Sequence, residues 1–199
     1  MLRLFEPCIP TKAIKPPSGE GWIHEIKHDG YRLIARRVED RVSLYTKGGF
    51  NWSARYPRIV AGLAMLNVSS VCIDGEVALV EEDHKADFNM LHSRIYDDAA
   101  VLCAFDLLEL NGEDLRDLPL LERKKRLKKV LGKGKRGLQY VDHWEGDGQK
   151  LFERVCRLGL EGIVSKRIDS RYRAGSSKHW IKTKNRGHAA LNRVRDSFA

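Results

Sequence analysis

The chain contains no apolar run that approaches the length of a membrane span, and its N-terminal MLRLFEPCIP lacks a signal-peptide pattern. The sequence therefore shows neither the usual signature of a membrane helix nor that of a secreted protein. The four cysteines are widely scattered, and no pair has the close spacing of a zinc site. We therefore expect reduced cysteines, no membrane partner and a cytoplasmic location, with disulfides as the alternative.

Low-complexity segments and internal repeats are also missing, so the 199 residues form one generous domain or two small ones. Positive charge is what the chain has in excess. Its 36 lysines and arginines stand against 27 aspartates and glutamates, a formal net charge of +9. This excess favours a polyanionic partner, with nucleic acid as the first candidate, and an ordinary basic surface as the alternative.

Hydrophobic periodicity predicts a mixture of strands and helices after an extended, proline-containing lead-in. Residues 32–37 and 41–46 alternate around an acidic turn, as the strands of a β-hairpin do. Strands flanked by helices favour an α+β domain with two antiparallel sheets around a central cleft. The expected strands are 21–28, 32–37, 41–46, 71–80, 101–110, 162–166 and 179–184, and the expected helices are 56–66, 88–95, 120–131 and 149–158.

The octapeptide EIKHDGYR, from Glu25 to Arg32, carries the strongest chemical signal in the chain. Its Lys27 stands at the end of an expected strand. A lysine becomes a nucleophile when burial or neighbouring cations free its lone pair. Gly30 permits a chain reversal, and Arg32 beyond it supplies charge for a phosphate or donors for a ribose. The octapeptide therefore predicts a phosphoryl-attacking lysine, and a surface lysine near a turn is the alternative.

Four short segments follow the octapeptide: Asp74-Gly75-Glu76, Phe105-Asp106-Leu107-Leu108, Glu161-Gly162-Ile163-Val164-Ser165-Lys166 and Trp180-Ile181-Lys182-Thr183-Lys184. With the pattern K-x-D-G-x-R in the octapeptide, their order resembles that of the covalent nucleotidyltransferases: DNA ligases, RNA ligases and mRNA capping enzymes. The resemblance runs from about Ile9 to Lys184. The resemblance is greatest to ATP-dependent DNA ligases of the bacterial end-joining type, in which the run YRAGSSKHW from Tyr172 to Trp180 also has a counterpart. It implies their two-part nucleotidyltransferase fold, with the nucleotide between the sheets.

The resemblance implies a role for four cations of these segments. Lys27 would attack the α-phosphate of ATP, expel pyrophosphate and keep AMP as a phosphoramidate. Arg32 would contact the ribose. Lys182 and Lys184, two residues apart and so on one face of a strand, would contact the α-phosphate. Solvent-facing strand lysines are the alternative for this last pair.

The resemblance also places four residues around the adenine. Glu25 and Ile26 would lie beside the base, where a carboxylate or a carbonyl can accept from its exocyclic amine. Phe105 and Val164 would stack on its two faces. An exposed strand glutamate is the alternative for Glu25, and a place in the hydrophobic core is the alternative for the two apolar residues.

Three carboxylates are expected to contact a metal ion: Glu161, Glu76 and Asp29. Phosphoryl transfer needs a divalent ion to offset developing charge, and Mg²⁺ or Mn²⁺ fits this role with a few carboxylates and water. Glu76 is expected to divide its role between ribose and metal. Asp74 is expected to serve local structure, and for Asp29 a turn-forming Asp-Gly pair is the alternative.

Basic residues outside the nucleotide site are expected at nucleic acid or at the solvent. Lys47, Lys166 and Arg173 are assigned to nucleic acid. The cations of the expected helix 120–131 are assigned to its solvated side, opposite an apolar stripe of leucines and Val130. Contact of these helix cations with a phosphate backbone is the alternative.

The chain departs from the family pattern at two places. Thr46-Lys47-Gly48-Gly49 stands where relatives commonly carry an arginine followed by an asparagine, so the bidentate guanidinium is lost there. Family ligases also carry an oligonucleotide-binding (OB) barrel after the last lysine strand. Here residues 1–184 are assigned to a nucleotidyltransferase domain, and 185–199 to a basic tail in place of the OB domain of a small, complete protein.

Together these patterns predict an ATP-dependent DNA ligase that seals nicks through a lysine–AMP intermediate, in DNA repair. No extra N-terminal domain for NAD⁺ is visible, so ATP is the implied donor. The expected partners are nicked duplex DNA and an end-bridging repair protein or a protein that supplies the OB domain, with the chain itself a monomer. An RNA ligase, a capping-type enzyme and a partner-dependent or non-catalytic nick-binding module remain as alternatives.

Overall fold

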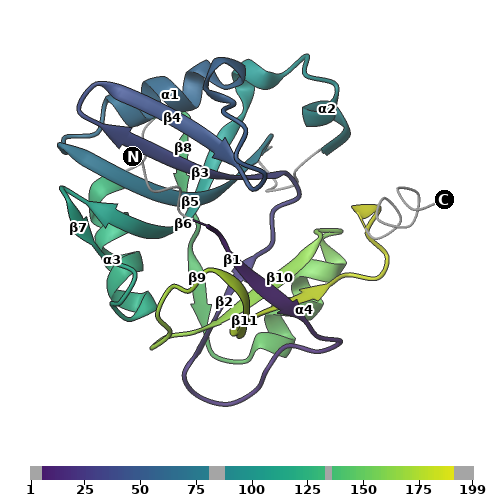
Figure 1. Ribbon diagram of the computed structural model, residues 1–199. Coiled ribbons are helices and arrows are strands. Elements are labelled where there is room, and N and C mark those ends of the chain that lie inside the picture. The colour runs from purple at the N-terminus through teal and green to yellow at the C-terminus, as the bar shows by residue number, and fades with distance from the viewer. Residues whose placement is uncertain (1–5, 81–87, 133–135, 191–199) are drawn as a thin grey trace.

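The computed structural model describes residues 6–80, 88–132 and 136–190. Two sheets form the two halves of the molecule, sheet B above and sheet A below in Figure 1. Sheet A has the strand order β1-β11-β10-β2-β9, and sheet B has the order β4-β3-β5-β6-β7 with β8 beside β6. This confirms the α+β class with two sheets.

Each expected strand and helix is present with the expected type and differs mainly at its ends, whereas residues 8–12, 113–114, 138–140 and 143–145 form strands that the sequence pattern does not predict. Helix α2 is shorter than expected, and β11 begins earlier. The strands are β1 (Cys8–Lys12), β2 (Trp22–Ile26), β3 (Tyr31–Val38), β4 (Arg41–Thr46), β5 (Ser70–Ala78), β6 (Val101–Leu110), β7 (Glu113–Asp114), β8 (Leu138–Tyr140), β9 (His143–Glu145), β10 (Gly162–Arg167) and β11 (Gly175–Lys184). The helices are α1 (Pro57–Ala64), α2 (Phe88–His92), α3 (Leu120–Leu131) and α4 (Gly148–Arg157), with 3₁₀ turns at Ser53–Arg55 and Asp97–Ala99.

The expectation of purely antiparallel sheets is wrong at two places. Strand β1 runs parallel to β11, and β8 runs parallel to β6. The lead-in that contains β1 was expected to be merely extended. Pro10 has no backbone N–H to donate to a ladder, which an edge strand tolerates, and β1 is an edge strand of sheet A.

The hairpin of β3 and β4 forms around Glu39-Asp40, as expected, and its two faces pack against different parts of the molecule. Leu33 and Ala35 of β3, with Leu44 of β4, point into the core of sheet B beneath α1. Ile34 points the other way and packs with Trp180 of sheet A in a smaller cluster that joins the two sheets. The alternation of a β-strand therefore gives sheet B a core side and a side that faces sheet A.

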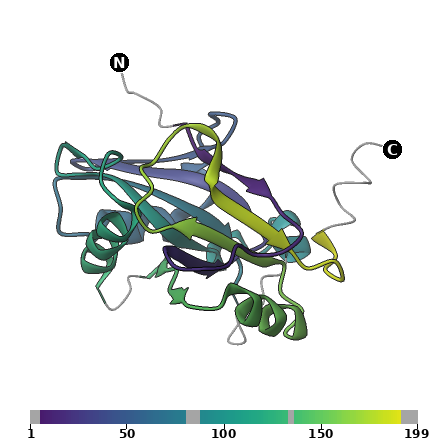
Figure 2. The same ribbon diagram turned by 90° about the horizontal axis from the view of Figure 1, so that it is seen from below.

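Helix α4 covers the outer face of sheet A, as Figure 2 shows from below. Its Val155 packs with Leu160 and with Ile163 of β10. The next residue along β10, Val164, points to the opposite side, toward sheet B. The helix thus closes one side of sheet A and leaves the other for the cleft.

For helix α3, the predicted bounds and buried leucines are confirmed, and the predicted exposure of all its charged residues is not. Leu120, Leu127 and Leu131 are buried as expected, and the helix ends at Gly132. The assignment of all its charges to the solvated side is wrong, because Arg123 and Lys124 are buried as well. They lie three and four residues after Leu120, on the same stripe of the helix, where they pair with buried carboxylates.

The four cysteines are free, and Cys8, Cys72 and Cys103 are buried, which agrees with the expected reduced thiols. Among the helices in the described part of the chain, none is long and apolar enough to cross a membrane.

Candidate active site

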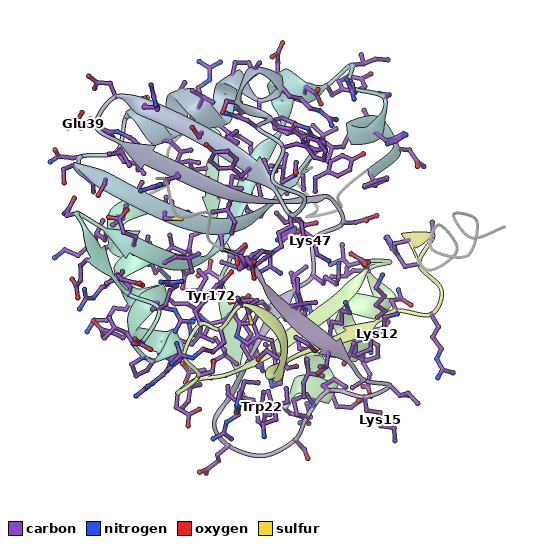
Figure 3. All side chains as sticks on the ribbon, in the orientation of Figure 1. Lys12, Lys15, Trp22, Glu39, Lys47 and Tyr172 are labelled. Atoms are coloured by element: carbon purple, nitrogen blue, oxygen red, sulfur yellow. The ribbon has the colours of Figure 1, made fainter. Side chains whose placement is uncertain are left out.

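A cavity of about 220 Å³ lies between the two sheets, and most of the residues expected at the nucleotide line it. Figure 3 shows Lys47 at this junction, reaching toward it from sheet B. Sheet A and its loops contribute Ile9, Pro10, Glu25, Ile26, Lys27, His28, Val164, Lys166, Trp180 and Lys182, and the sheet B side contributes Arg32, Lys47, Glu76 and Phe105.

Lys27 follows directly on the end of β2, as the sequence predicts. Its backbone N–H donates to the Gly162 carbonyl at 2.9 Å, which ties the residue to β10. Three residues beyond it, the loop to β3 passes so close to β5 that a Cβ on Gly30 would lie 1.9 Å from the Val77 carbonyl oxygen. Glycine at this position therefore lets the loop pack against sheet B and carry Lys27 to the junction of the sheets.

Glu161 holds the ammonium of Lys27. The Lys27 Nζ lies 2.5 Å from Glu161 Oε2, and Lys184 Nζ lies 2.9 Å from Oε1 of the same carboxylate. Burial alone would raise the pKa of Glu161, but the two ammonium groups outweigh it and lower that pKa. Glu161 is therefore an ionised anchor for Lys27 and for the end of β11.

Lys182 adds a second cation to the cavity from the same face of β11 as Lys184. Burial lowers the pKa of Lys182, and the ammonium groups of Lys27, Lys12 and Lys184 lower it further. Cations that repel one another in this way favour the binding of an anion between them, because the anion relieves the repulsion. This side of the cavity is suited to a phosphate.

Arg32 is fixed on the opposite wall by a buried carboxylate. Its Nε and Nη2 donate to Asp74 at 2.9 and 2.5 Å, and Tyr172 Oη donates to the same carboxylate at 2.6 Å. Burial favours the neutral guanidine, yet the Asp74 carboxylate outweighs burial and raises the pKa of Arg32. Asp74 thus serves local structure, in agreement with the sequence interpretation, by holding Arg32 against the cavity.

The apolar wall of the cavity contains a second aromatic residue, Trp180, besides the predicted Phe105. The rings of Phe105 and Trp180 meet edge to face with centroids 6.1 Å apart. Lys166 Nζ lies 4.3 Å from the Phe105 centroid and 4.0 Å from that of Trp180. Val164 lines the cavity from sheet A, whereas Phe105 lines it from sheet B. Trp180 was missed as a site residue because an aromatic in an apolar strand has the same pattern as core.

Glu25 lies at the cavity with both carboxylate oxygens already engaged. Its Oε1 lies 2.5 Å from Lys124 Nζ and its Oε2 lies 2.6 Å from Lys166 Nζ. Burial opposes ionisation, but the two ammonium groups outweigh it and lower the pKa of Glu25. The side chain is therefore the anion of a buried cluster, and its expected role toward adenine stays a prediction.

Two residues expected at nucleic acid lie in unexpected surroundings. Lys166 is only 1% exposed, which does not fit a contact with the DNA backbone, because its ammonium is enclosed by Glu25 and two rings. Arg173 is exposed but does not line the cavity, and its guanidinium donates to Asp117 at 2.8 Å. Lys47, the third, is exposed and lines the cavity.

Glu76 faces the cavity from β5. Burial raises the pKa of Glu76 to about 7, against the attraction of Lys27 and Arg32. A raised carboxyl pKa means that the protonated form stabilises the fold. This stabilisation is complete below pH 4.5, the ordinary value, and is lost as the pH rises through about 7.

Without nucleotide or metal, the free energy of unfolding of the wild type is expected to fall relative to that of Glu76→Gln as the pH rises from 4.5 to about 7. The expected fall is about 2 kcal/mol, since each unit of pKa shift corresponds to about 1.4 kcal/mol and partial exposure reduces the effect. Urea denaturation at a series of pH values measures it. Two parallel pH curves would contradict the assignment.

Comparison with known proteins identifies this arrangement. Residues 4–184 match the family model of the ATP dependent DNA ligase domain. The chain belongs to this family. The match covers both sheets and every cavity-lining residue, so the sequence resemblance and the family agree.

Curated relatives of this ligase domain include much longer proteins. The multifunctional non-homologous end joining protein LigD of Pseudomonas aeruginosa is 37% identical over 174 residues, which cover 85% of this chain and 21% of that protein. The bifunctional non-homologous end joining protein LigD of Bacillus subtilis is 30% identical over 207 residues, covering 88% and 33%. The chain therefore spans only 21–33% of the length of these two relatives.

Solved structures of ligase domains share the fold. A mycobacterial DNA ligase D in complex with ATP and MES has a TM-score of 0.77 and 30% identity, covering 89% of this chain and 59% of that one. The ligase domain of Mycobacterium tuberculosis LigD has the same TM-score and identity, covering 89% and 58%. The predicted family and the predicted nucleotidyltransferase fold are confirmed.

The ligase domain offers a partial set of metal ligands. Among the described residues, no group of three or more histidines, cysteines, aspartates or glutamates could hold a metal ion. Mg²⁺ usually takes one or two carboxylates and completes its shell with water and substrate phosphates. Glu76 fits this role, whereas Glu161 has both oxygens occupied by lysines and Asp29 does not line the cavity.

Proposed function

We propose that this domain carries out adenylyl transfer in the sealing of nicked DNA, with Lys27 as the nucleophile. One observation carries the proposal. Lys27 lines a cavity in which Lys182 and Lys47 supply positive charge, and Phe105 of sheet B and Val164 of sheet A supply apolar surface. A nucleoside triphosphate has a flat apolar base and an anionic end, so the cavity complements both parts.

The proposed reaction has three displacements. In the first, the lone pair of Lys27 Nζ forms a bond to the α-phosphorus of ATP, the bond to pyrophosphate breaks, and the amine gives up its proton. In the second, an oxygen of a DNA 5′-phosphate takes the AMP, and the lysine amine leaves. In the third, a 3′-hydroxyl attacks the 5′-phosphorus, loses its proton and releases AMP.

Residues around Lys27 would prepare it and stabilise the charge that develops. Glu161 fixes the position of Nζ through its hydrogen bond. Lys182 and Lys184 would offset negative charge on the α-phosphate, and Arg32 would contact the ribose from the opposite wall. Because Glu161 also binds Lys184, a phosphate that draws Lys184 away would free one oxygen of the Glu161 carboxylate.

A divalent ion, Mg²⁺ or Mn²⁺, would supply charge neutralisation at the phosphates. Glu76 is the residue best placed to hold it, and Glu161 would join once a lysine leaves its carboxylate. The pKa of Glu76 near 7 supports this role, because a nearby cation favours ionisation of a carboxyl that burial has left close to neutral pH.

The setting of the reaction is part of the proposal. Relatives named as end-joining proteins support nicked or broken duplex DNA as substrate and a role in repair. We propose that a monomer works in the cytoplasm with an end-bridging protein or one that supplies an OB domain. The division into a domain at 1–184 and a basic segment at 185–199 in place of an OB domain is also a proposal, and residues 191–199 lie outside the described ranges.

The experiment begins with ATP labelled at the α-phosphate, Mg²⁺ and the whole chain, followed by denaturing electrophoresis. A labelled protein band that is cleaved by acid, as a phosphorus–nitrogen bond is, is the expected result. Addition of a nicked duplex with a 5′-phosphate is then expected to move the label to DNA and to yield a sealed strand.

Other outcomes would favour the other functions. Labelling by GTP in preference to ATP would favour a capping-type enzyme, and transfer only to RNA would favour an RNA ligase. If no protein is labelled and a pre-adenylated nick is not sealed, while nicked DNA is bound, the proposed catalysis is wrong. The domain would then be a nick-binding module, and its Lys27→Ala variant is predicted to bind nicked DNA as well.

A further inference from the structure

One face of the β3–β4 hairpin continues beyond the nucleotide cavity as a row of basic and hydroxyl side chains. Alternate residues of a strand share a face, so Arg41, Ser43 and Tyr45 lie on one side of β4, the side that faces the cleft. Lys47 comes directly after β4 and lines the cavity. Arg36 pairs with Ser43 across the hairpin and shares this face. We refer to Arg36, Arg41, Ser43, Tyr45 and Lys47 as the basic hairpin face.

The far part of this face is an open groove of about 300 Å³, lined by Arg36, Val38, Glu39, Arg41, Ser43 and Tyr45. All six belong to the hairpin, so sheet A does not cover the groove. Arg41 is exposed. Glu39 is the acidic residue of the lining, and it stands at the outer tip of the hairpin, where Figure 3 shows it at the opposite end from Lys47.

Arg36 has donor capacity that the described residues do not use. Its Nε is buried, yet among the described residues it has no hydrogen-bond partner. A buried guanidinium N–H without an acceptor is costly, and an incoming anion would satisfy it. With the hydroxyls of Ser43 and Tyr45 and the exposed Arg41 beside it, the groove has the donors that phosphate oxygens accept from.

The length of the face matches a stretch of duplex. A β-strand rises about 3.3 Å per residue, so Arg41 at the start of β4 and Lys47 directly after its end lie roughly 20 Å apart. Base pairs in duplex DNA are spaced about 3.4 Å apart, so this distance corresponds to about six base pairs. A duplex whose nick lies at the cavity would therefore place a phosphate about six base pairs away at the Arg36–Arg41 groove.

We propose that the basic hairpin face binds the sugar–phosphate backbone of one flank of the nicked duplex, with Arg36 and Arg41 as the contacts most distant from the nick. The proposal rests on the proposed function, because it takes the cavity as the position of the nick. Double-stranded DNA is the occupant that fits both the charge and the length. The contact is a positioning one, far from the reacting atoms.

The test measures binding of nicked duplexes to the whole chain by fluorescence anisotropy, with each flank in turn about twelve or about four base pairs long. The variants are Arg36→Ala with Arg41→Ala, and Arg41→Gln alone, which changes only an exposed side chain. The matched control is Arg154→Ala with Arg157→Ala, two exposed arginines of α4 on the outer side of sheet A.

The double variant is expected to bind the long duplex about tenfold more weakly, and its plot of log K against log salt should be shallower by about two. Shortening one of the two flanks to about four base pairs should weaken wild-type binding and abolish the difference between wild type and variant. Arg41→Gln should show about half of the change in slope, and the control pair should show none.

A loss that is equal on long and short flanks, or no loss beyond that of the control pair, would overturn the proposal. Self-adenylation with labelled ATP is measured on the same proteins. If it fails in the wild type while the flank-dependent loss is observed, the proposed catalysis is wrong and the DNA-binding face stands. If adenylation proceeds and the flank dependence is missing, the proposed catalysis stands and the proposed DNA-binding face is wrong.

Discussion

A Lys27→Arg variant is expected to fold normally and to form no covalent AMP adduct. Arginine keeps a positive charge and can still donate to Glu161, which now lies 2.5 Å from Lys27 Nζ. Its guanidinium does not deprotonate in proteins and offers no lone pair for attack on phosphorus. Removing the nucleophile of a covalent mechanism costs about 10⁴-fold or more in rate. The adduct is measured with labelled ATP on a denaturing gel.

The control for this variant is Lys15→Arg. Lys15 is exposed and points away from the junction of the sheets in Figure 3. The Lys15→Arg variant should form the AMP adduct at the wild-type rate. Both variants should melt within a degree or so of the wild type, since neither substitution removes a buried group. An acid-labile AMP adduct that persists in Lys27→Arg would show that another lysine, with Lys182 the first to test, is the nucleophile.

The largest loss of stability is expected from Asp106→Ala. Asp106 and Arg123 are both completely buried and joined by two hydrogen bonds of 2.8 Å. Arg123 also donates to the carbonyls of Leu118 and Ser170. Removal of one partner leaves an uncompensated buried charge, which costs about 3–5 kcal/mol. For a chain of this size that corresponds to a fall in Tm of about 10 °C, measured by thermal and urea denaturation.

The matched control is Asp142→Ala. Asp142 and Lys128 form an ion pair at 3.2 Å with side chains 79% and 65% exposed, and such pairs contribute little. A double replacement, Asp106→Leu with Arg123→Met, should recover much of the loss, because it removes both charges together. If Asp106→Ala costs no more than Asp142→Ala, the buried pair does not hold α3 to sheet B.

Local chemistry made part of this protein predictable from sequence. The hairpin follows from alternation around Glu39-Asp40, and the turn at Asn111-Gly112 follows from residues that tolerate positive φ, observed at 51° and 85°. The placement of Lys27 follows because β2 ends one residue before it. Each of these depends on neighbours within a few positions along the chain.

Helix α3 shows where such reasoning fails. Its repeat of leucines gives the correct helix and the correct end, but the prediction that charged residues face the solvent is wrong at Arg123 and Lys124. Whether a charged side chain on an apolar stripe is buried depends on its partner. Here the partners, Asp106 and Glu25, come from β6 and β2 and leave no trace in the helix itself.

The sequence by itself determined the family, the nucleophile candidate, the order of most strands and helices and the residue types around a nucleotide, because these depend on short segments and local periodicity. Only the tertiary structure decided that β1 joins sheet A in parallel, that Trp180 and Lys166 close the cavity wall, and that the carboxylate of Glu25 is already bound through both oxygens. The physical reason is the same in each case. Pairing across sheets and burial of charge are long-range choices, settled by which side chains the two sheets bring within hydrogen-bonding distance.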